Sequence, residues 1–527
     1  MRSIRPLQRH ALPFVLAATL SSATCFVFRT VSVESVPPAR SAGPPTRVQS
    51  PLKAHLDDGS VVLFRGGATL EGDTVRGHGE LYDLKLRSRG AVTAVPLSRV
   101  LAMENYREGV DAAGTVAVSM LATVGFIGGS VALYCAADPK CFGSCPTAYS
   151  DSAGTLVLEA EGFSYSIAPL FEAGDVDRLR ARAGADGTLR LEVRNEALET
   201  HYINQIELLE ARHAADETVL PDPRHDLVAV SGLVPPGSAT DRAGRDVLPA
   251  LAAHDGVVFG TDSTTLARAD SADPDDWIDL EWASRPAGDS AALVFRMRNS
   301  LLNTVLLYDL MLGDHGARAL DYLGMDLQRP ADALALGRWY AGRMGMRVSV
   351  WEAGAWRAVG RVPDTGPIAW KDAALLIPLP PAGPLRVRLS FPADDWRIDR
   401  VALASGARRV RPRTVPLARV LDADGHADSA ALANLAAADA RYLETSAGQR
   451  FEAVFDVGPE PADSARTFLL AWRGFYDEWI RRTWIERGAE RRAFTPGDGA
   501  LAAALRRWSA TQDSTERVFY RTRVPVR

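Results

Sequence analysis

The 527-residue chain contains little cysteine and almost no lysine. Its 4 cysteines are Cys25, Cys135, Cys141 and Cys145, so everything after residue 145 folds without disulfides. Arginine supplies nearly all of the positive charge. The net charge of −5 and the absence of a basic stripe give no reason to expect a nucleic acid partner.

The sequence also lacks the short motifs of common chemistries. Its 9 histidines are scattered, and neither H-x-x-x-H nor H-E-x-x-H occurs, so no metal site is predicted. There is no G-x-S-x-G elbow, no P-loop and no G-x-G-x-x-G after a strand. No cofactor is therefore expected, and no catalytic residue can be assigned. The D-A-D-G segment 422–425 is expected to be a β-turn rather than a calcium loop, because the rest of an EF-hand pattern is missing.

Residues 1–29 have the pattern of an export leader. Arg2, Arg5 and Arg9 form a basic region, and an apolar run follows. The run ends in L-S-S-A-T-C, which resembles a lipoprotein processing site with Cys25 as the lipidated residue. Plain cleavage and a retained anchor are the alternatives. Each of the three places the residues after about 30 outside the cytoplasm, at least initially.

A second apolar segment, 110–137, is uncharged from Ala112 onward. It is long enough to cross a bilayer as a helix, at about 1.5 Å per residue over ~30 Å. Gly125 and Gly129 form G-x-x-x-G, a spacing that lets helices approach closely in lipid. The alternative is a buried hairpin that turns at Gly128 and Gly129. The membrane is therefore an expected partner. A single span would place the residues before and after the segment on opposite sides of the membrane, whereas a hairpin would keep both outside the cytoplasm, and we favour the extracytoplasmic location.

Most of the remaining sequence has strand texture. Apolar runs alternate with Asp-Gly turns over 50–107, which predicts a small β-barrel or roll after a Pro-rich linker at 30–49. Strand alternation then continues to about residue 485. Helical pattern is sparse, and the best candidates are 331–344 and 429–439.

The β-rich region repeats itself in three blocks that keep their order. Residues 189–209 resemble 385–403, residues 241–255 resemble 422–439, and W-I-D-L-E-W at 277 resembles R-F-E-A-V-F at 450. The repeat predicts two superposable antiparallel sandwiches, at about 185–310 and 381–484. In them Ile203 and Ile398 should occupy equivalent buried positions.

Two resemblances follow from particular residues. W-R-I-D-R-V (396–401), after W-E-A-G-A-W (351–356) and L-R-V-R-L, resembles the closing strands of galactose-binding-like β-sandwiches. Many of these bind sugars through loops, so the resemblance implies a candidate sugar module. The stretch S-C-P-T-A-Y-S (144–150) resembles a segment of an uncharacterised group of bacterial envelope proteins. That group implies an envelope location and no activity.

The cysteine loop allows more than one interpretation. Cys141 and Cys145 are spaced for a small disulfide, which suits an exported chain. C-F-G-S-C-P also resembles the copper site of thioredoxin-fold copper-delivery proteins. Here, however, the surroundings lack the βαβ pattern of that family. The disulfide is the interpretation we prefer.

An aromatic run near the end of the β-rich region, W-R-G-F-Y-D-E-W, is compatible with strand or helix. As a helix it would place Trp472, Phe475, Tyr476 and Trp479 on one face. A packed core face is one interpretation. A binding platform for carbohydrate or a protein partner is the other.

The sequence thus predicts a mostly β chain: a small N-terminal β-barrel or roll, one apolar helical segment, then tandem antiparallel β-sandwiches. We expect a membrane-anchored, extracytoplasmic protein of the cell envelope, and we favour a non-enzymatic binding or assembly module over an enzyme. The alternative is a carbohydrate-binding or carbohydrate-active envelope protein. The expected divisions are 1–29 leader, 30–49 linker, 50–107 β-module, 110–137 apolar segment, 138–225 first β-region with the cysteine loop, 226–410 galactose-binding-like sandwich, and 411–527 second repeat unit and tail.

Overall fold

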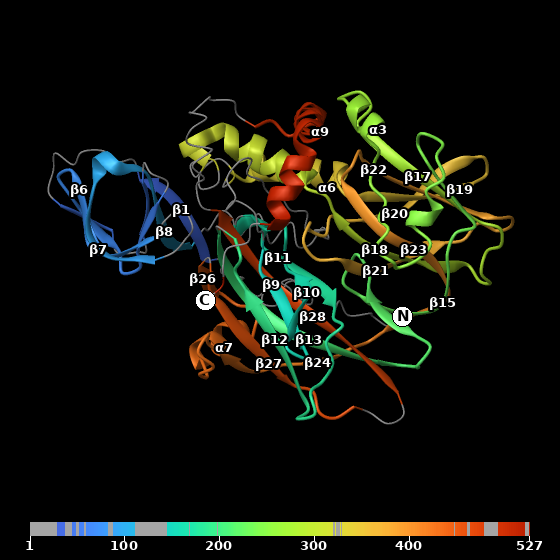
Figure 1. The fold of residues 1–527 in the computed structure, drawn as a ribbon, viewed down its shortest axis with the longest axis horizontal. Helices are drawn as coiled ribbons and strands as arrows, with labels where there is room; N and C mark the ends of the chain where they lie inside the picture. Colours follow the sequence, from blue (N-terminus) through green and yellow to red (C-terminus); the bar gives the residue numbers. More distant parts are fainter. Residues whose placement is uncertain are drawn as a thin grey trace, which may run out of the picture.

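The structure is a computed structural model (Figure 1). It describes residues 29–36, 45–48, 52–56, 60–82, 88–110, 145–167, 169–197, 199–319, 322, 327, 329–446, 448–460, 464–478, 494–521 and 526. The chain is mostly β, in several antiparallel sheets, as predicted. The leader before residue 29 and the apolar segment 112–137 lie outside the described residues. Within the described residues, no helix is both long and apolar enough to cross a membrane.

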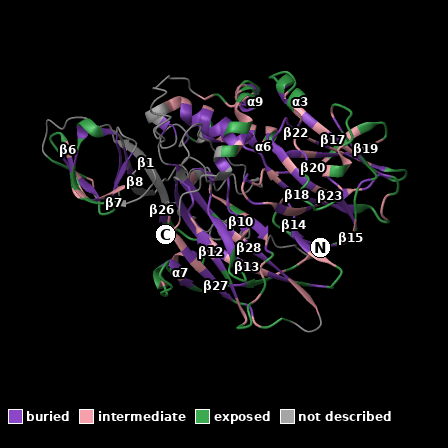
Figure 2. Ribbon diagram, viewed as in Figure 1, coloured by how far each residue is buried: buried purple, intermediate pink, exposed green. Residues whose placement is uncertain are grey.

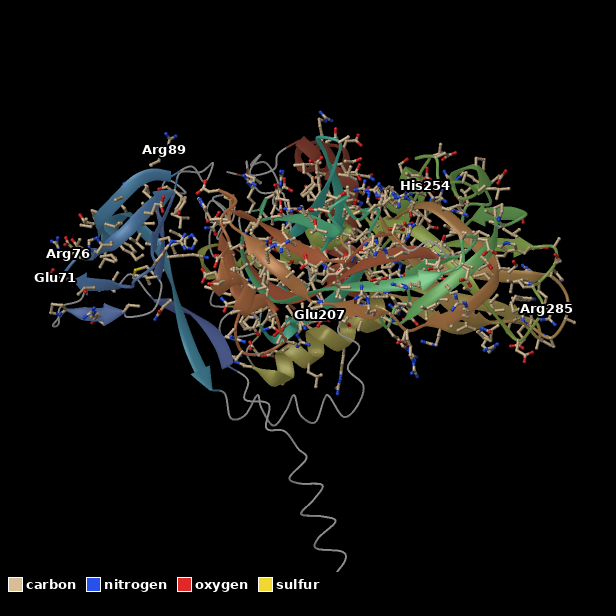
Figure 3. All side chains as sticks on the ribbon, turned by 90° about the horizontal axis from the view of Figure 1, so that it is seen from below. Glu71, Arg76, Arg89, Glu207, His254 and Arg285 are labelled. Atoms are coloured by element: carbon tan, nitrogen blue, oxygen red, sulfur yellow. The ribbon has the colours of Figure 1, made fainter. Side chains whose placement is uncertain are left out.

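The N-terminal module is an eight-stranded antiparallel sheet around its own core (Figures 1 and 3). Leu52, Phe64, Val75 and Met103 are fully buried in that core. Figure 3 shows the module at one end of the molecule, where Glu71 and Arg76 form an exposed ion pair of 3.0 Å. Its strands are β1 (Arg29–Val36), β2 (Thr46–Val48), β3 (Leu52–Leu56), β4 (Val61–Phe64), β5 (Ala68–Glu71), β6 (Thr74–Tyr82), β7 (Ser88–Pro96) and β8 (Val100–Val110), with the 3-10 turn η1 (Leu97–Arg99) before β8.

The predicted linker 30–49 is not an extended tether throughout. β1 pairs with β8 over its whole length, from Arg29 opposite Val110 to Val36 opposite Met103, and β2 pairs with β5. The local sequence V-S-V-E-S-V alternates apolar and polar residues, which suits an added strand. The prolines that suggest a tether follow β1 instead of interrupting it.

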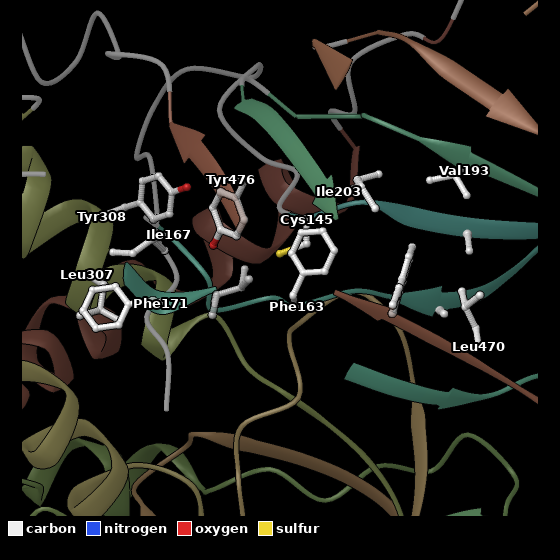
Figure 4. Close-up of a cluster of buried hydrophobic side chains, with 14 of the residues drawn as sticks. Cys145, Phe163, Ile167, Phe171, Val193, Ile203, Leu307, Tyr308, Leu470 and Tyr476 are labelled. Carbon is white, nitrogen blue, oxygen red and sulfur yellow. The ribbon is translucent and has the colours of Figure 1, made fainter. Parts of the chain in front are cut away.

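The first of two larger units, here called the host sandwich, consists of two five-stranded sheets over one core. Alternating residues such as Leu189, Leu191 and Val193 point inward and meet Ile206 and Leu470 of the facing sheet (Figure 4). Its outer sheet has the order β10 (Thr155–Glu161), β9 (Thr147–Ser152), β12 (Thr188–Arg194), β27 (Arg450–Asp456), β25 (Leu417–Leu421). Its inner sheet has β11 (Ala173–Arg178), β28 (Ala465–Glu478), β13 (Glu199–His213) and β24 (Arg413–Val415), and β26 (Leu443–Ser446) also pairs with β13.

The second unit, the inserted sandwich, is built the same way. Residues of both its sheets, among them Ile278, Phe295, Val387 and Val401, share one core. Its inner sheet has the order β14 (Thr218–Pro221), β15 (Leu227–Val234), β23 (Trp396–Val410), β18 (Ser290–Asn299), β21 (Lys371–Pro378). Its outer sheet has the order β16 (Ser238–Asp241), β17 (Asp275–Trp282), β22 (Leu385–Pro392), β19 (Met346–Glu352), β20 (Ala355–Val362).

The chain nests one sandwich inside the other. β9 to β13 precede the inserted sandwich in sequence, and β24 to β28 follow it, yet they pair in the same two sheets. β12 and β27, for example, pair from Thr188 opposite Asp456 to Arg194 opposite Arg450. The predicted separation of 138–225 from 411–527 is therefore corrected: strands of both segments make up one unit.

The internal repeat is structural, but its copies are not sandwiches. Each copy contains strands of both sandwiches. In the first copy β12 and β13 belong to the host and β15 to β18 to the insert; in the second copy β22 and β23 belong to the insert and β25, β27 and β28 to the host. Ile203 and Ile398 are both fully buried, as the repeat predicts. A bulge residue follows each of them, Asn204 in β13 and Asp399 in β23, where the pairing register shifts. The predicted ranges 185–310 and 381–484 thus contain matched strands shared between two units.

The two inner sheets face each other across the joint between the sandwiches. Val176 and Leu469 of the host pack with Val219, Leu227 and Ala229 of the insert. Lys371 of the insert forms ion pairs with Asp175 and with Asp177, the latter at 2.9 Å. Figure 2 shows these central strands as mostly buried, with exposed residues toward the ends of the molecule. On the outer sheet of the insert, the residues that alternate with the core residues, such as Trp277 and Arg388, are partly exposed.

α6, α9 and α3 lie at one end of the sandwiches, and α7 lies at the other end, beside the host strands (Figure 1). α6 has Pro330 at its start, Asp332 in its first turn and Arg343 in its last, which suits both the backbone geometry and the helix dipole. It confirms the helix predicted over 331–344, and α7 confirms the one predicted over 429–439. The helical elements are α3 (Ser263–Arg268), α4 (Leu302–Thr304), the π-helix η4 (Val305–Leu312), α6 (Pro330–Arg343), α7 (Ser429–Leu435), α9 (Asp498–Arg521), and the 3-10 turns η2 (Pro169–Phe171), η3 (Leu248–Ala250) and η5 (Gly313–Arg318).

Candidate functional site

The outward face of the insert's outer sheet carries tryptophan and arginine side by side. In β17, Ile278, Leu280 and Trp282 point into the core, so Trp277 points outward. The same alternation turns Arg386 and Arg388 of β22 outward. The face therefore combines large aromatic rings with fixed charges.

The hairpin of β19 and β20 adds two further rings. Trp351 and Trp356 lie directly opposite each other, with ring centroids 5.2 Å apart in an edge-to-face arrangement. Their hairpin closes through Ala353 and Gly354, which both have positive φ, as a type I′ turn requires. Trp277, Trp351 and Trp356 are all half-buried. We call these three rings, with Arg242, Arg386 and Arg388, the Trp–Arg face.

The guanidinium groups of this face stack on the rings in an alternating series. Arg242 lies 4.7 Å and Arg388 4.9 Å from the centroid of the Trp277 ring. Arg388 also lies 4.6 Å from Trp356, and Arg386 lies 5.7 Å from it and 5.1 Å from Trp351. Cation–π contacts of this kind stabilise by roughly 0.5–1 kcal/mol each at exposed sites. They also hold the guanidinium groups in defined positions.

In two of the three arginines, N–H donors are hydrogen-bonded to a carboxylate. Arg388 donates to both carboxylate oxygens of Asp279, at 2.6 and 2.7 Å. Arg242 bonds both oxygens of Asp273, and this carboxylate holds the pKa of Arg242 above its usual range. Arg386 has a weaker partner, because its Nε lies 3.9 Å from Glu281. These three arginines therefore differ in how far their donors are already used.

The host sandwich has no such face at the equivalent described positions. Strand pairing places Arg450 where the insert has Trp277, since Phe455 pairs with Leu189 as Trp282 pairs with Leu385. The β9–β10 hairpin has the same turn as the β19–β20 hairpin, with alanine and glycine at positive φ. There, Asp151 and Leu156 stand opposite each other in the places of Trp351 and Trp356. The host's outer sheet has one ring with a stacked arginine, Tyr149 with Arg194 at 4.8 Å, but that ring is buried. Among the described residues of the two copies, the set of half-buried tryptophans is thus specific to the insert.

The aromatic run suggested as a binding platform is part of a strand. Trp472, Phe475 and Tyr476 lie in β28 and are at most 2 % exposed, so they are core residues and not a surface platform. The helical interpretation of this run is therefore wrong over residues 472–478. Trp479 lies outside the described residues. Trp472 and Tyr476 face the host core, whereas Phe475 lies on the other face of the sheet, where its ring stacks on Tyr202 and contacts Tyr442.

Cys145 begins the host sandwich and is buried. Its backbone has φ 66°, and the repeat places Gly345 of the insert at the equivalent position with φ 79°. Its amide donates to Glu199 Oε2 at 3.0 Å (Figure 4 shows its place in the core). Cys141 and Cys25 lie outside the described residues. The Cys141–Cys145 disulfide and the lipidation of Cys25 therefore stay predictions.

A buried carboxyl pair lies at the joint of the sandwiches and the helices. Asp364 accepts hydrogen bonds from Tyr340 Oη at 2.7 Å and Asn299 Nδ2 at 2.8 Å, and Asp395 accepts one from Asn303 Nδ2 at 2.9 Å. Burial raises the pKa of Asp364, and burial and the charge of Asp364 raise the pKa of Asp395 strongly. One shared proton satisfies this pair, as in other close carboxyl pairs. Because Asp395 is fully buried, a role in packing fits better than contact with a substrate.

The Asp422–His426 turn brings together side-chain atoms that can bind a metal. Carboxylates of Asp422 and Asp424 and the His426 ring lie within 4.8 Å of one another, and all are exposed. The insert makes the same turn at Asp241, where the Asp241 carboxylate accepts from the amide of Arg245 as Asp422 accepts from that of His426. In the insert, the arginine thus stands in the place of the histidine. The arrangement is the expected β-turn.

Comparison with known proteins assigns the chain to no family. No protein-family model matches the chain, and no curated protein matches it. A search of solved structures gave the crystal structure of the GH31 alpha-xylosidase from Xanthomonas citri, at 10% identity and a TM-score of 0.15. The match covers 83% of this chain and 38% of that one. A similarity this weak supports no argument about fold or activity.

Proposed function

We propose that this protein is a non-enzymatic binding module of the cell envelope, and that it binds carbohydrate at the Trp–Arg face. The observation that carries the proposal is the set of half-buried rings of Trp277, Trp351 and Trp356 on one sheet face. Indole rings combine large apolar area with a polar edge, which suits ligands that present both C–H and O–H groups. The galactose-binding-like resemblance of 351–401 points in the same direction.

Tryptophans of the sandwich cores contrast with these rings. Trp396 and Trp472 are 0% and 2% exposed, as expected of core residues. The rings of Trp351 and Trp356 remain partly accessible, although the host builds the same hairpin with Asp151 and Leu156. Ring exposure that is confined to one copy of a repeat favours a ligand over a packing requirement.

The test is binding of purified full-length protein to a panel of soluble polysaccharides by affinity electrophoresis. We expect retardation by at least one polysaccharide, and Trp356→Ala should abolish most of it. Leu156→Ala is the matched control, because Leu156 occupies the equivalent hairpin position in the host. Retardation that is lost equally in both variants, or is absent for every polysaccharide, contradicts the proposal.

The envelope location is part of the same proposal. It is supported by the leader pattern of residues 1–29, by the lipoprotein-like end at Cys25, and by the apolar segment 110–137. If this segment enters and leaves the membrane on the same side, as a hairpin that turns at Gly128 and Gly129, the sandwiches face the extracytoplasmic side, where polysaccharides are found. Protease digestion of intact and permeabilised cells tests this, and resistance of the sandwiches in intact spheroplasts but not in lysed ones would contradict it.

A further inference from the structure

We infer that the ligand of the Trp–Arg face is an anionic carbohydrate, and that Arg386 binds its carboxylate or sulfate group. This inference rests on the proposed function and specifies its ligand class. It begins with the ring faces. Trp277 and Trp356 each have two guanidinium groups within 6 Å of their centroids. Rings covered in this way have less face available for a neutral sugar to stack upon.

Stacked guanidinium groups still have donors to offer. The five N–H groups of arginine lie in the plane of the guanidinium, so a group lying flat over a ring directs them sideways, away from the ring. Such an edge matches the two oxygens of a carboxylate or a sulfate. The chemistry of this face therefore favours oxyanions over neutral hydroxyl groups.

Arg386 has the donors that a ligand can use. Its Nε is 3.9 Å from Glu281 Oε2, beyond hydrogen-bond distance, and the two side chains are 41% and 48% exposed. An exposed ion pair of this length contributes little and is easily exchanged. The contacts with Trp351 and Trp356 hold the guanidinium in place before a ligand arrives, which lowers the entropy lost on binding. Arg388, by contrast, is held by both oxygens of Asp279.

The host supplies a natural comparison for Arg386. Arg190 occupies the equivalent position in β12, because Leu189 pairs with Phe455 as Leu385 pairs with Trp282. Arg190 donates to Glu452 at 2.8 Å and also contacts Asp186 at 3.5 Å. Its charge is thus neutralised by two carboxylates. Arg190→Gln removes the same charge from the chain without touching the Trp–Arg face.

The experiment uses full-length protein and two matched pairs of probes. Polygalacturonate is compared with its fully methyl-esterified form, and dextran sulfate with dextran, by affinity electrophoresis at increasing salt. We expect one or both anionic members to bind and their neutral partners not to bind. The two pairs distinguish a carboxylate ligand from a sulfate ligand. Binding should weaken as salt rises, because the contact is exposed.

Substitutions then locate the contact. Arg386→Gln should weaken anion binding by about tenfold or more, as expected for loss of a charge-assisted hydrogen bond. Arg386→Lys should give an intermediate loss because lysine lacks the planar fork, and Arg190→Gln should have no effect. Equal binding of charged and neutral partners, with loss in Trp356→Ala, overturns this inference and leaves the proposed function standing. Equal losses in Arg386→Gln and Arg190→Gln also overturn it, whereas failure of every polysaccharide to bind overturns the proposed function.

Discussion

The host and inserted sandwiches have the same strand order and different outer faces. In both, the outer sheet runs in equivalent order, β25-β27-β12-β9-β10 in the host and β16-β17-β22-β19-β20 in the insert. Both bury the alternating residues of the same strands, and both close one hairpin with an Ala-Gly turn. The outward residues diverge: Trp351 and Trp356 of the insert correspond to Asp151 and Leu156 of the host. The inward residues form the core and keep the fold, whereas the outward residues can change and form a binding surface.

The order of the strands in the chain links the two sandwiches, because host strands lie both before and after the insert. The host is completed only after the insert has been synthesised, since β12 pairs with β27 across the whole inserted unit. The strand pairs that hold the host are therefore among the longest-range contacts in the protein. Such contacts cost more closure entropy and form slowly. We expect the insert, whose strands are contiguous in sequence, to fold first.

The largest expected effect on stability comes from removing a buried charge at the joint between the two sandwiches. Lys371→Met removes the cation that faces Asp175 and Asp177, and it leaves the buried Asp177 and the half-buried Asp175 without a cationic partner at this position. Breaking a buried ion pair from one side costs about 3–5 kcal/mol. The free energy of unfolding in urea should fall by that amount. Arg408→Met, at an exposed pair with Glu217, is the control and should cost less than about 1 kcal/mol. A smaller loss in Lys371→Met than in the control would contradict the role of the joint.

The second prediction compares matched core positions. Leu470 of β28 and Leu293 of β18 are fully buried, and each lies four residues before the residue that pairs with Ile203 or Ile398. Leu→Ala at either site should cost about 2–5 kcal/mol through lost burial and a residual cavity.

Calorimetry distinguishes two ways in which the sandwiches can respond. If they unfold together, both variants lower one common transition. A separate transition that moves only in Leu293→Ala would show that the insert unfolds by itself. The matched pair thus measures how strongly the joint couples the two copies.

Much of the β architecture is predictable because it depends on short-range alternation. The inward residues of β12, β13, β22 and β23 follow a period of two, and their similarity alone reveals the repeat. The nested connection is not predictable in this way. No local pattern states that β12 pairs with β27 and not with a nearer strand. The repeat blocks are correct, but their division into two contiguous sandwiches is wrong.

The candidate site could be predicted only in part from the sequence. W-E-A-G-A-W predicts a strand, a turn and a strand, which the structure confirms. A module that serves structure alone would bury both tryptophans, and here Trp351 and Trp356 are only half-buried. The more informative signal is the register of L-R-V-R-L: its arginines alternate with core residues, so they share a face with Trp277 and Trp351. The run around Trp472 misleads for the opposite reason. A strand covered on both sides loses its alternation and can be mistaken for a helix face.

A third prediction uses a carboxyl group that the insert has and the host lacks. Asp276 lies directly before Trp277, and the equivalent host residue is Gln449, directly before Arg450. Burial raises the pKa of Asp276 from 3.8 to about 6, although its carboxylate accepts from Thr261 Oγ1 at 2.7 Å. The folded protein therefore holds this proton more tightly than the unfolded chain. Its contribution to stability is complete below pH 3.8 and is lost as pH rises through about 6.

Asp276→Asn should remove this pH-dependent contribution, because asparagine is neutral at every pH. The difference between the two pKa values corresponds to at most about 3 kcal/mol. Urea unfolding of both proteins between acid and neutral pH measures it. Wild type should lose stability relative to the variant as pH rises, with the change complete above about pH 6. Parallel curves would mean that Asp276 has the same pKa in the folded and unfolded states.

The smallest expected effect concerns a feature that the two copies share. Ala353 has φ 50° and Ala153 has φ 54°, and each is the first residue of a two-residue hairpin turn. Alanine is strained in this left-handed region, whereas asparagine is the preferred residue at this position of a type I′ turn. Both residues are exposed, so their replacement sacrifices no packing. Ala353→Asn and Ala153→Asn should each stabilise the protein by up to about 1 kcal/mol.

The melting temperature should therefore rise by similar, small amounts in the two variants. Carbohydrate binding should change in neither, since the side chain at the tip of the turn is not part of the Trp–Arg face. A gain in only one variant would show that the hairpins, although alike in backbone, are under different strain. The copies would then have diverged in their turns as well as on their outer faces.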